Sequence, residues 1–127
     1  MRTAWVAAVA LTMIGCTGTS SMAQDVESGQ ALFRQCRAYH QIGPGAKNLV
    51  GPQLNGIIGR KASSSEGFSY SDASKAAAAK GLTWTEEELM KYLEAPAEFM
   101  PGTKMAFAGL KDEADRKDLI AYLKSVK

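Results

Sequence analysis

Cys36-Arg37-Ala38-Tyr39-His40 is the stretch on which the interpretation of the whole chain depends, because it joins the only histidine to one of the two cysteines. Side chains four residues apart project from the same face of a helical turn. The Cys36 thiol and the His40 imidazole are therefore expected to lie side by side. Such a pair can bind a cofactor or a metal, can act as a catalytic thiolate and base, or can be a buried cysteine beside a hydrogen-bonded histidine.

This stretch differs by one residue from a known attachment pattern. Covalent haem attachment uses Cys-x-x-Cys-His, in which each thiol bonds one vinyl group of the haem and the histidine binds the iron. Tyr39 stands at the second cysteine position. A phenol does not add to a vinyl group as a thiol does, so only one thioether, through Cys36, is possible. The catalytic alternative lacks an evident orienting residue or oxyanion site.

The residues at the start of the chain are typical of an export signal. An arginine is followed by an apolar run from Ala4 to Ile14 and then by small or hydroxyl residues up to Ala23. This is the pattern of a signal peptide, and the run is too short to span a bilayer. We expect a cleaved signal peptide at residues 1–23 and a periplasmic domain at residues 24–127. In the alternative, Cys16 is acylated and anchors a lipoprotein.

Without the expected signal peptide, the chain has 104 residues with 14 basic and 13 acidic side chains. This near balance gives no support to nucleic-acid binding, which requires a strongly basic face with interleaved aromatic residues. Cys36 is then the one cysteine left, so no internal disulfide is possible. We expect a single domain that is a monomer. Its thiol is available for a covalent use, an intermolecular disulfide or burial.

Four short helices are predicted, and no strand or repeat stands out, so the expected fold class is all-α. Polar residues that can cap a helix precede them, and their apolar residues recur at intervals of three or four. Thr85 and Glu88 form a capping-box pattern, and Gly81 follows the second helix as a left-handed stop. The expected helices run from Asp25 through Cys36, from Ser71 to Lys80, from Thr85 to before Pro96, and from about Asp112 to Val126.

Two long stretches of turn residues separate these helices. Residues 41–70 contain six glycines and two prolines without sustained periodicity, and a second loop runs from Pro101 to Gly109. Short helices and long loops build a poor core at this size, and long loops in compact domains usually carry function. A large apolar cofactor inside the loops would supply the missing core. Otherwise the domain is simply rich in loops.

Met105 adds a second candidate ligand, because it places a thioether in the turn-rich segment Pro101-Gly102-Thr103-Lys104-Met105. With this segment the sequence resembles the class I cytochromes c, in particular the short bacterial ones close to the mitochondrial protein. The matching segments keep the order and nearly the spacings of that family. They are Gly29 to Cys36, His40, Gly51-Pro52-Gln53-Leu54, Gly59-Arg60-Lys61, Gly67-Phe68-Ser69-Tyr70, Gly81-Leu82-Thr83-Trp84, Tyr92-Leu93-Glu94 with Pro96, Pro101 to Met105 with Phe107-Ala108-Gly109, and Asp118 to Leu123.

The resemblance implies a class I cytochrome c fold of about four short helices wrapped with long loops around one haem c. It implies His40 and Met105 as the axial ligands of the iron, on opposite faces, and Cys36 as the residue that makes the thioether. It also implies that the first and last helices cross. The other residues that it assigns are Arg60, Tyr70 and Trp84 near a haem propionate, Thr103 in the methionine loop, and Gly29, Phe33, Leu119 and Tyr122 at the helix crossing.

With both axial positions filled, the implied function is electron transfer without catalysis. The resemblance implies a soluble periplasmic carrier between respiratory or photosynthetic membrane complexes, such as a cytochrome bc complex and a terminal oxidase or photosynthetic reaction centre. Lys47, Lys80 and Lys104 are candidates for docking to acidic partners. Three alternatives stay open: a maturation-impaired variant with weak haem loading, a peroxidase-like haem protein, and a haem-free domain with a reactive thiol.

Overall fold

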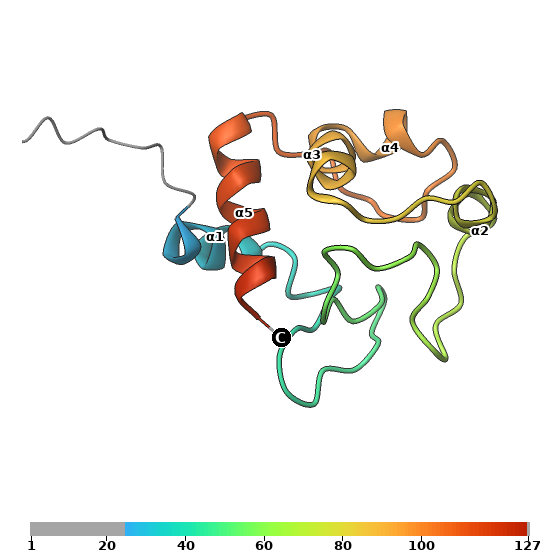
Figure 1. Cartoon of the computed structure of the whole chain (residues 1–127), viewed down its shortest axis with the longest axis horizontal. Helices are drawn as coiled ribbons and strands as arrows, with labels where there is room; N and C mark the ends of the chain where they lie inside the picture. The colour runs from blue at the N-terminus through green and yellow to red at the C-terminus, as the bar shows by residue number, and fades with distance from the viewer. Residues whose placement is uncertain (1–24, 127) are drawn as a thin grey trace, which may run out of the picture.

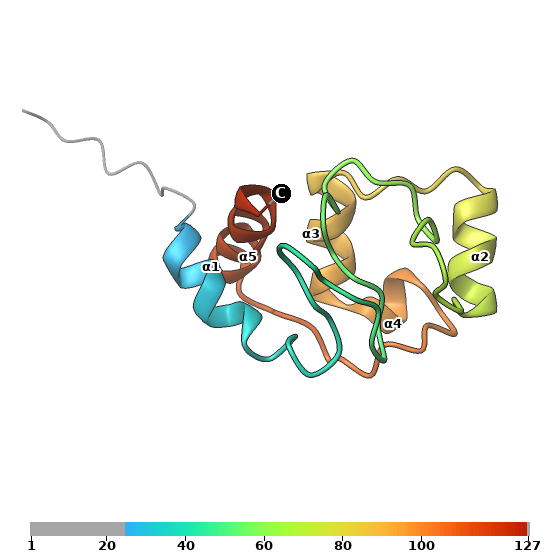
Figure 2. The same ribbon diagram turned by 90° about the horizontal axis from the view of Figure 1, so that it is seen from below.

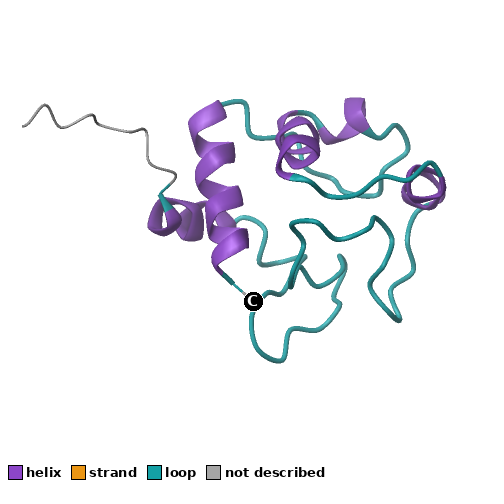
Figure 3. Cartoon of the chain, viewed as in Figure 1, coloured by secondary structure: helices purple, strands orange, loops and turns teal. Residues whose placement is uncertain are grey.

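Helices provide the regular structure of the residues that the computed structural model describes, 25–126. Figure 3 shows no strand in this part of the chain, where two isolated β-bridges join His40 to Asn48 and Lys61 to Thr83. The all-α prediction is confirmed. The helices are α1 (Val26–Phe33), α2 (Asp72–Ala79), α3 (Glu86–Glu94), α4 (Pro96–Phe99) and α5 (Glu113–Ser125).

The predicted signal peptide, residues 1–23, lies outside the described residues, and so does Cys16. A helix that crosses a bilayer needs about 20 predominantly apolar residues. Within residues 25–126, no helix combines the length and the apolar character that a membrane crossing requires.

α1 and α5 cross at one end of the molecule, and they lie side by side in both Figure 1 and Figure 2. Gly29 allows this approach, since a Cβ atom there would collide with the backbone carbonyl of Asp118. Close by, the ring centroids of Phe33 and Tyr122 are 5.5 Å apart. Such an aromatic pair contributes about 0.5–1.5 kcal/mol beyond the burial of its area. The predicted contact between the terminal helices is confirmed.

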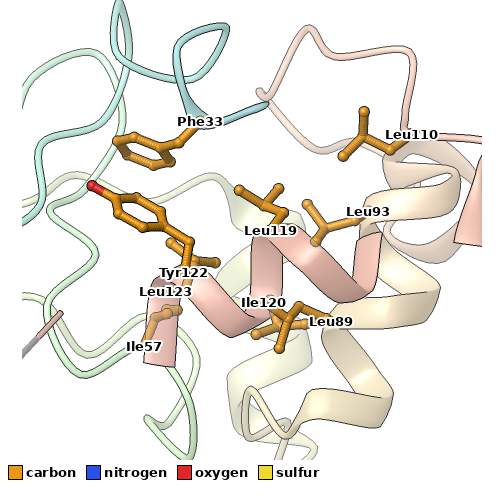
Figure 4. Close-up of a cluster of buried hydrophobic side chains, with 9 residues drawn as sticks. All are labelled: Phe33, Ile57, Leu89, Leu93, Leu110, Leu119, Ile120, Tyr122 and Leu123. Atoms are coloured by element: carbon orange, nitrogen blue, oxygen red, sulfur yellow. The ribbon is translucent and has the colours of Figure 1, made fainter. Parts of the chain in front are cut away.

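The hydrophobic core forms where α5 packs against α1 and α3, as Figure 4 shows. Leu119 is its most deeply buried member, with 1% of its surface exposed. Full burial of a leucine side chain stabilises a fold by about 1.5–3 kcal/mol. The side chains of this cluster are Phe33, Ile57, Leu89, Leu93, Leu110, Leu119, Ile120, Tyr122 and Leu123.

Side-chain caps begin the four longer helices, as the sequence predicts. Asp25, Ser71, Thr85 and Asp112 each accept a hydrogen bond from a backbone N–H in the first turn of the following helix. A cap of this kind contributes about 1 kcal/mol. The capping box is half formed: the Glu88 N–H reaches Thr85 Oγ1 at 3.1 Å, whereas the N–H of Thr85 donates to a nearby backbone carbonyl.

The first helix is shorter than the sequence predicts. α1 ends at Phe33, and the chain continues to His40 as a series of turns, so Cys36 does not lie on α1. The backbone bonds change there to the tighter i to i+3 pattern, as in the bond from the Cys36 N–H to the Phe33 carbonyl at 2.8 Å. Such turns are frequent at helix ends.

α4 is a correction to the predicted helix count, which becomes five instead of about four. A proline ordinarily ends a helix, and α3 does end at Glu94, just before Pro96. Proline is nevertheless well tolerated at the first position of a helix, where its missing N–H would have no partner. Pro96 therefore starts a new short helix where the prediction has a loop.

α2 stands apart from the other helices. Figures 1 and 2 show it at the end of the molecule opposite α1 and α5, and it packs against no other helix of the described residues. The loops of residues 34–71 and 100–112 occupy the space between the helices. Loops consequently form much of the wall around the interior of the molecule.

Candidate functional site

A cavity of about 800 Å³ opens between the loop of residues 34–71, the loop of residues 100–107 and the inner sides of α3 and α5. Its volume is within the range of cofactor sites. Arg60, Lys61 and Lys104 are among the residues that line it, and no carboxylate of the described residues is. The cavity therefore suits a ligand that is largely apolar and also carries negative charge.

His40 lines this cavity with its ring fixed in one orientation. Its Nδ1 donates to the Pro52 carbonyl oxygen at 2.7 Å, because a carbonyl oxygen can only accept. The lone pair is then on Nε2, as in metal-binding histidines whose other nitrogen is held by a second partner. Burial lowers the pKa of His40, the Pro52 bond partly offsets this, and Arg60 lowers it further. The imidazole is consequently in its neutral, ligating form.

The backbone packs closely behind the His40 ring. A Cβ atom at Gly51 would collide with the imidazole. The loop of residues 48–53 therefore forms a wall against which the ring rests, and only glycine fits at this point of contact. This wall leaves the ring few alternative positions.

Cys36 and His40 form the helical turn that their spacing predicts. The His40 N–H donates to the Cys36 carbonyl at 2.9 Å, which is an i to i+4 bond. Both side chains line the cavity. Burial raises the pKa of the half-buried Cys36 thiol, so the thiol is protonated at neutral pH. The two groups are thus brought together on one wall of the cavity.

Tyr39 lies at the rim of the same cavity, with 48% of its surface exposed. Its N–H donates to the Cys36 carbonyl at 3.0 Å, and its carbonyl accepts from the Gly51 N–H at 2.8 Å. The exposed apolar side chains of Leu49 and Val50 line the cavity near it. The tyrosine ring is therefore accommodated at the surface, while its backbone keeps the turn that orients Cys36.

Met105 reaches the cavity from the loop that follows α4. The Tyr92 hydroxyl donates to Met105 Sδ at 3.7 Å and lies 3.3 Å from Thr103 Oγ1. Thr103 Oγ1 in turn accepts from the Met105 N–H at 3.3 Å. Burial raises the pKa of Tyr92, and its hydrogen bond with Thr103 lowers it in part, so the phenol remains a donor. Two hydroxyl groups thereby hold the thioether loop in place.

Arg60 is fixed by its terminal nitrogens and has one N–H left unpaired. Nη1 and Nη2 donate to the carbonyl oxygens of Asn55 and Gln53, at 3.0 and 2.9 Å. Nε is buried without a hydrogen-bond partner. Burial lowers the pKa of Arg60 and Tyr70 raises it, and a guanidinium stays charged at any physiological pH. An unpaired buried N–H costs about 1–3 kcal/mol, and the carboxylate of a ligand in the cavity would supply the acceptor that it lacks.

Tyr70 and Trp84 line the cavity together with Arg60. The Tyr70 oxygen accepts from the Ser65 N–H at 2.9 Å, so its own proton is available to another acceptor. The Trp84 ring packs against Tyr92, with 4.9 Å between the ring centroids. The structure thus brings every predicted site residue to one cavity: Cys36, Tyr39, His40, Arg60, Tyr70, Trp84, Thr103 and Met105.

Comparison with known proteins agrees with this arrangement. Residues 26–127 match the family described as Cytochrome c. The chain belongs to the cytochrome c family. It is 51% identical to the cytochrome c2 of Blastochloris viridis over 114 residues, which cover 90% of this chain and 87% of that protein. It is 53% identical to the cytochrome c2 of Rhodoblastus acidophilus over 105 residues, which cover 83% and 95%.

The same family appears among solved structures. The structure of cytochrome c2 from Rhodospirillum centenum matches with a TM-score of 0.76 and 43% sequence identity, over 80% of this chain and 97% of that one. The cytochrome cH of Methylobacterium extorquens matches with a TM-score of 0.73 and 41% identity, over 80% and 98%. The expected class I cytochrome c fold is confirmed.

Membership of the cytochrome c family implies one covalently bound haem c per chain. The cavity residues fit this group. A neutral imidazole and a thioether are a common ligand pair for haem iron in cytochromes c. The unpaired Nε of Arg60 can pair with a haem carboxylate, and the protonated Cys36 thiol can add to one vinyl group.

Sequence reasoning missed two residues that orient the candidate ligands, Pro52 and Tyr92. Pro52 is visible in the sequence as a turn residue, but its carbonyl meets His40 across 12 positions of an irregular loop, which no local pattern reveals. Tyr92 is more accessible to prediction. It falls on the inner side of α3 with Leu89 and Leu93, and a tyrosine on a buried face needs a hydrogen-bond partner.

Proposed function

We propose that this protein is a soluble periplasmic electron carrier in which His40 and Met105 would hold the iron of one haem. Cys36 holds the haem through a single thioether. The observation that carries the proposal is the pairing, in one cavity, of an imidazole with a fixed tautomer and a thioether held by Tyr92. The names of the relatives, cytochromes c2 among them, support the same function.

When bound, the haem supplies a one-electron couple between ferric and ferrous iron. His40 and Met105 would both hold the iron, and with both bound no position would be left for a substrate. Pro52 and Tyr92 hold these two side chains in the same place whichever oxidation state the iron has. Fixed ligands keep the rearrangement that accompanies electron transfer small, which is the contribution of the protein.

The cavity also sets the direction in which the reduction potential is tuned. A methionine sulfur ligand raises the potential relative to a second histidine. The Tyr92 hydroxyl donates to that sulfur, which withdraws electron density from it and acts in the same direction. The apolar lining disfavours the additional positive charge of ferric iron.

The protein has no catalytic activity of its own under this proposal. A peroxidase-like reaction would require Met105 to leave the iron and open a position for peroxide. Tyr92 and Thr103 both contact the Met105 residue and oppose that movement. A reaction of this kind would therefore need the methionine loop to rearrange.

Residues 1–23 direct export and are removed, so Cys16 is lost with them. The mature chain is a monomer in the periplasm. It exchanges electrons with membrane redox complexes: a cytochrome bc complex on one side, and a terminal oxidase or photosynthetic reaction centre on the other. The match to relatives named cytochrome c2, and the export pattern of the first residues, support this assignment.

The test is the attachment state of haem in the exported protein. The expected results are a haem-stained band that survives denaturation, and a pyridine haemochrome α band between those of two-thioether haem and of haem with two free vinyl groups. Intact mass should equal the chain from Gln24 plus one haem. Cys36→Ser is the control, and its haem should be lost on denaturation.

Two results would contradict the proposal. A colourless exported protein with a titratable Cys36 thiol would establish the maturation-impaired or haem-free alternative. In that case the chain binds no haem because Tyr39 replaces the second cysteine. A haem protein whose ferric form binds peroxide rapidly, with loss of the methionine–iron absorption band, would establish the peroxidase-like alternative.

A further inference from the structure

The segment that carries α2 is attached to the rest of the molecule by few contacts. α2 buries none of its residues and has no helix packed against it in the described part of the chain. Three backbone hydrogen bonds close the base of this segment: Gly59 N–H to the Trp84 carbonyl at 2.7 Å, Ala62 N–H to the Leu82 carbonyl at 2.9 Å, and Trp84 N–H to the Arg60 carbonyl at 2.8 Å. Residues 63–81, here named the α2 flap, extend from this pinned base.

Ser63, the first residue of the flap, has a strained backbone. Its φ is 57°, and it is the one residue other than glycine with a positive φ within residues 25–126. A left-handed conformation costs an ordinary residue about 1–2 kcal/mol. Strain of this kind persists only where the surrounding structure enforces it, and it collects at functional sites. An interaction made by Ser63 in this conformation should therefore offset the free-energy cost of the strained backbone.

The strained conformation places the Ser63 hydroxyl against α2. Ser63 Oγ and Ser74 Oγ are 2.8 Å apart and hydrogen-bonded. In the described structure, this is the one side-chain hydrogen bond that joins α2 to a residue outside the helix and its own caps. The earlier half of the flap is held separately, because Asn48 bonds both Ser65 Oγ and the Glu66 carbonyl.

Both serines also line the haem cavity, as Arg60 and Tyr70 do, and the Ser65 N–H in the same segment donates to the Tyr70 oxygen at 2.9 Å. In this closed arrangement, with the hydrogen bond formed, the Nε of Arg60 is buried. If α2 moved outward, water would reach Arg60. The water would then accept the hydrogen bond from its Nε in place of a haem carboxylate. Breaking the hydrogen bond between the two serines is therefore expected to increase the access of water to Arg60.

We propose that the Ser63–Ser74 hydrogen bond is a latch that keeps the α2 flap closed over the Arg60 side of the cavity. The two serines are positioning residues: they act through α2, fixing the space for the haem carboxylates and excluding water from it. The latch itself is independent of the electron-carrier role, whereas its effect on the haem rests on that proposed function.

Native-state hydrogen exchange of the haem-loaded protein tests the latch directly. Ser63→Ala and Ser74→Ala should each speed exchange of the α2 amides about threefold to tenfold, as expected for the loss of one hydrogen bond. Alanine is the better helix former, so faster exchange in Ser74→Ala cannot result from lower helix propensity. The matched control is Ser64→Ala, at an exposed serine next to the latch, and it should leave exchange unchanged.

The double variant Ser63→Ala/Ser74→Ala separates a latch from two independent serines. Since both single changes remove the same bond, the double variant should exchange no more than about twofold faster than the faster single variant. Multiplied effects in the double variant would overturn the proposal. So would unchanged α2 exchange, or equal acceleration in α5, which would indicate a global loss of stability.

Two further variants distinguish the hydroxyl from the backbone strain. Ser74→Thr retains a hydroxyl on α2 and should restore exchange to the wild-type rate. Ser63→Gly loses the hydroxyl but relieves the left-handed strain, so it should exchange more slowly than Ser63→Ala. Failure of Ser74→Thr to rescue, or faster exchange in the glycine variant than in the alanine variant, would contradict the latch.

The reduction potential tests the effect on the haem. Water that reaches an open cavity stabilises ferric iron, so Ser63→Ala and Ser74→Ala should lower the potential while Ser64→Ala leaves it unchanged. An unchanged potential with accelerated α2 exchange would overturn the positioning role and leave the latch established. Absence of haem from the wild type as well as from every variant would overturn the proposed function, and with it the positioning role of the two serines.

Discussion

Tyr39 occupies the second attachment position in a backbone that forms a hydrogen-bonded turn. Its N–H and carbonyl make the turn bonds, and 48% of the surface of the residue is exposed. We therefore expect Tyr39→Cys to form a second thioether, because the turn that aims Cys36 at the haem would aim the new thiol as well. The pyridine haemochrome α band should move to the two-thioether position, and the mass of the haem peptide should show both bonds.

Tyr39→Ser is the control for this change, because it removes the ring without supplying a thiol. Its haemochrome band should stay where the wild-type band is. If Tyr39→Cys also left the band in place, the turn would not have the geometry that the structure assigns to it.

Tyr92 tunes the methionine ligand through a single hydrogen bond of 3.7 Å to Met105 Sδ. Tyr92→Phe should lower the reduction potential, because the sulfur regains the electron density that the hydroxyl withdraws. A hydrogen bond of about 0.5–1.5 kcal/mol corresponds to about 20–60 mV for one electron. Potentiometric titration measures the shift. Tyr122→Phe, in the core beside Phe33, should leave the potential unchanged, and equal shifts in both variants would argue against this role.

The candidate iron ligands could be predicted from the sequence, whereas the long-range hydrogen bonds around the cavity could not. Cys36 and His40 are four residues apart, so their proximity follows from local helical geometry. Pro52 reaches His40, and Ser63 reaches Ser74, only after loops without periodicity have folded back. The left-handed φ of Ser63 was equally beyond prediction, because serine does not favour that conformation.

The crossing of α1 and α5 depends on the absence of a side chain at Gly29. In Gly29→Ala, the new methyl group would meet the Asp118 carbonyl, a backbone atom that cannot move without shifting α5. We expect a loss of about 3 kcal/mol in the free energy of unfolding, at the upper end of the cost of overpacking. Urea denaturation measures it. Gln30→Ala, on the exposed side of the same helix, should change stability by about 0.5 kcal/mol or less.

The cap of α1 should make stability depend on pH in the acid range. Hydrogen bonds from the Ser28 N–H and hydroxyl, with a further one from the Glu27 N–H, hold the pKa of Asp25 below its ordinary value of 3.8. The carboxylate therefore stabilises the fold above this pH, and the contribution is lost as pH falls through the folded-state pKa. Unfolding of the wild type and Asp25→Asn should differ by a constant amount near pH 6 and converge below 3.8. A constant difference throughout would contradict this.

Helices with strong local signals were predicted well, and those shaped by their surroundings were not. α2, α3 and α5 begin at the caps that the sequence shows, Ser71, Thr85 and Asp112. The early end of α1 and the existence of α4 have no comparable local signal. The turns after Phe33 place Cys36, Tyr39 and His40 on the cavity wall, whereas no residue of α4 lines the cavity.

Charge is distributed unevenly over the whole molecule. Residues 28–65 contain five basic and no acidic side chains, whereas acidic side chains gather in residues 86–98 and 112–118. Lys61 and Lys104 line the cavity, whose rim is the approach to the haem. Association with an acidic redox partner should therefore be steered by charge although the net charge is small.

We expect the bimolecular rate of electron exchange with a solubilised cytochrome bc complex to fall about tenfold between about 10 and about 200 mM salt. Lys47→Gln should reduce this salt dependence. Lys91→Gln should not, because Lys91 is on α3 and pairs with Glu87. Stopped-flow kinetics at several salt concentrations measure the slope. A rate independent of salt would show that the uneven charge does not guide docking.

The two ends of the chain complete each other, since the Asp25 N–H donates to Asp118 at 2.8 Å across 93 positions. A chain synthesised from its N-terminus cannot close this contact until its final helix has followed. A chain that stops before Glu113 would therefore leave Gly29 and Phe33 of α1 without the partners that α5 supplies.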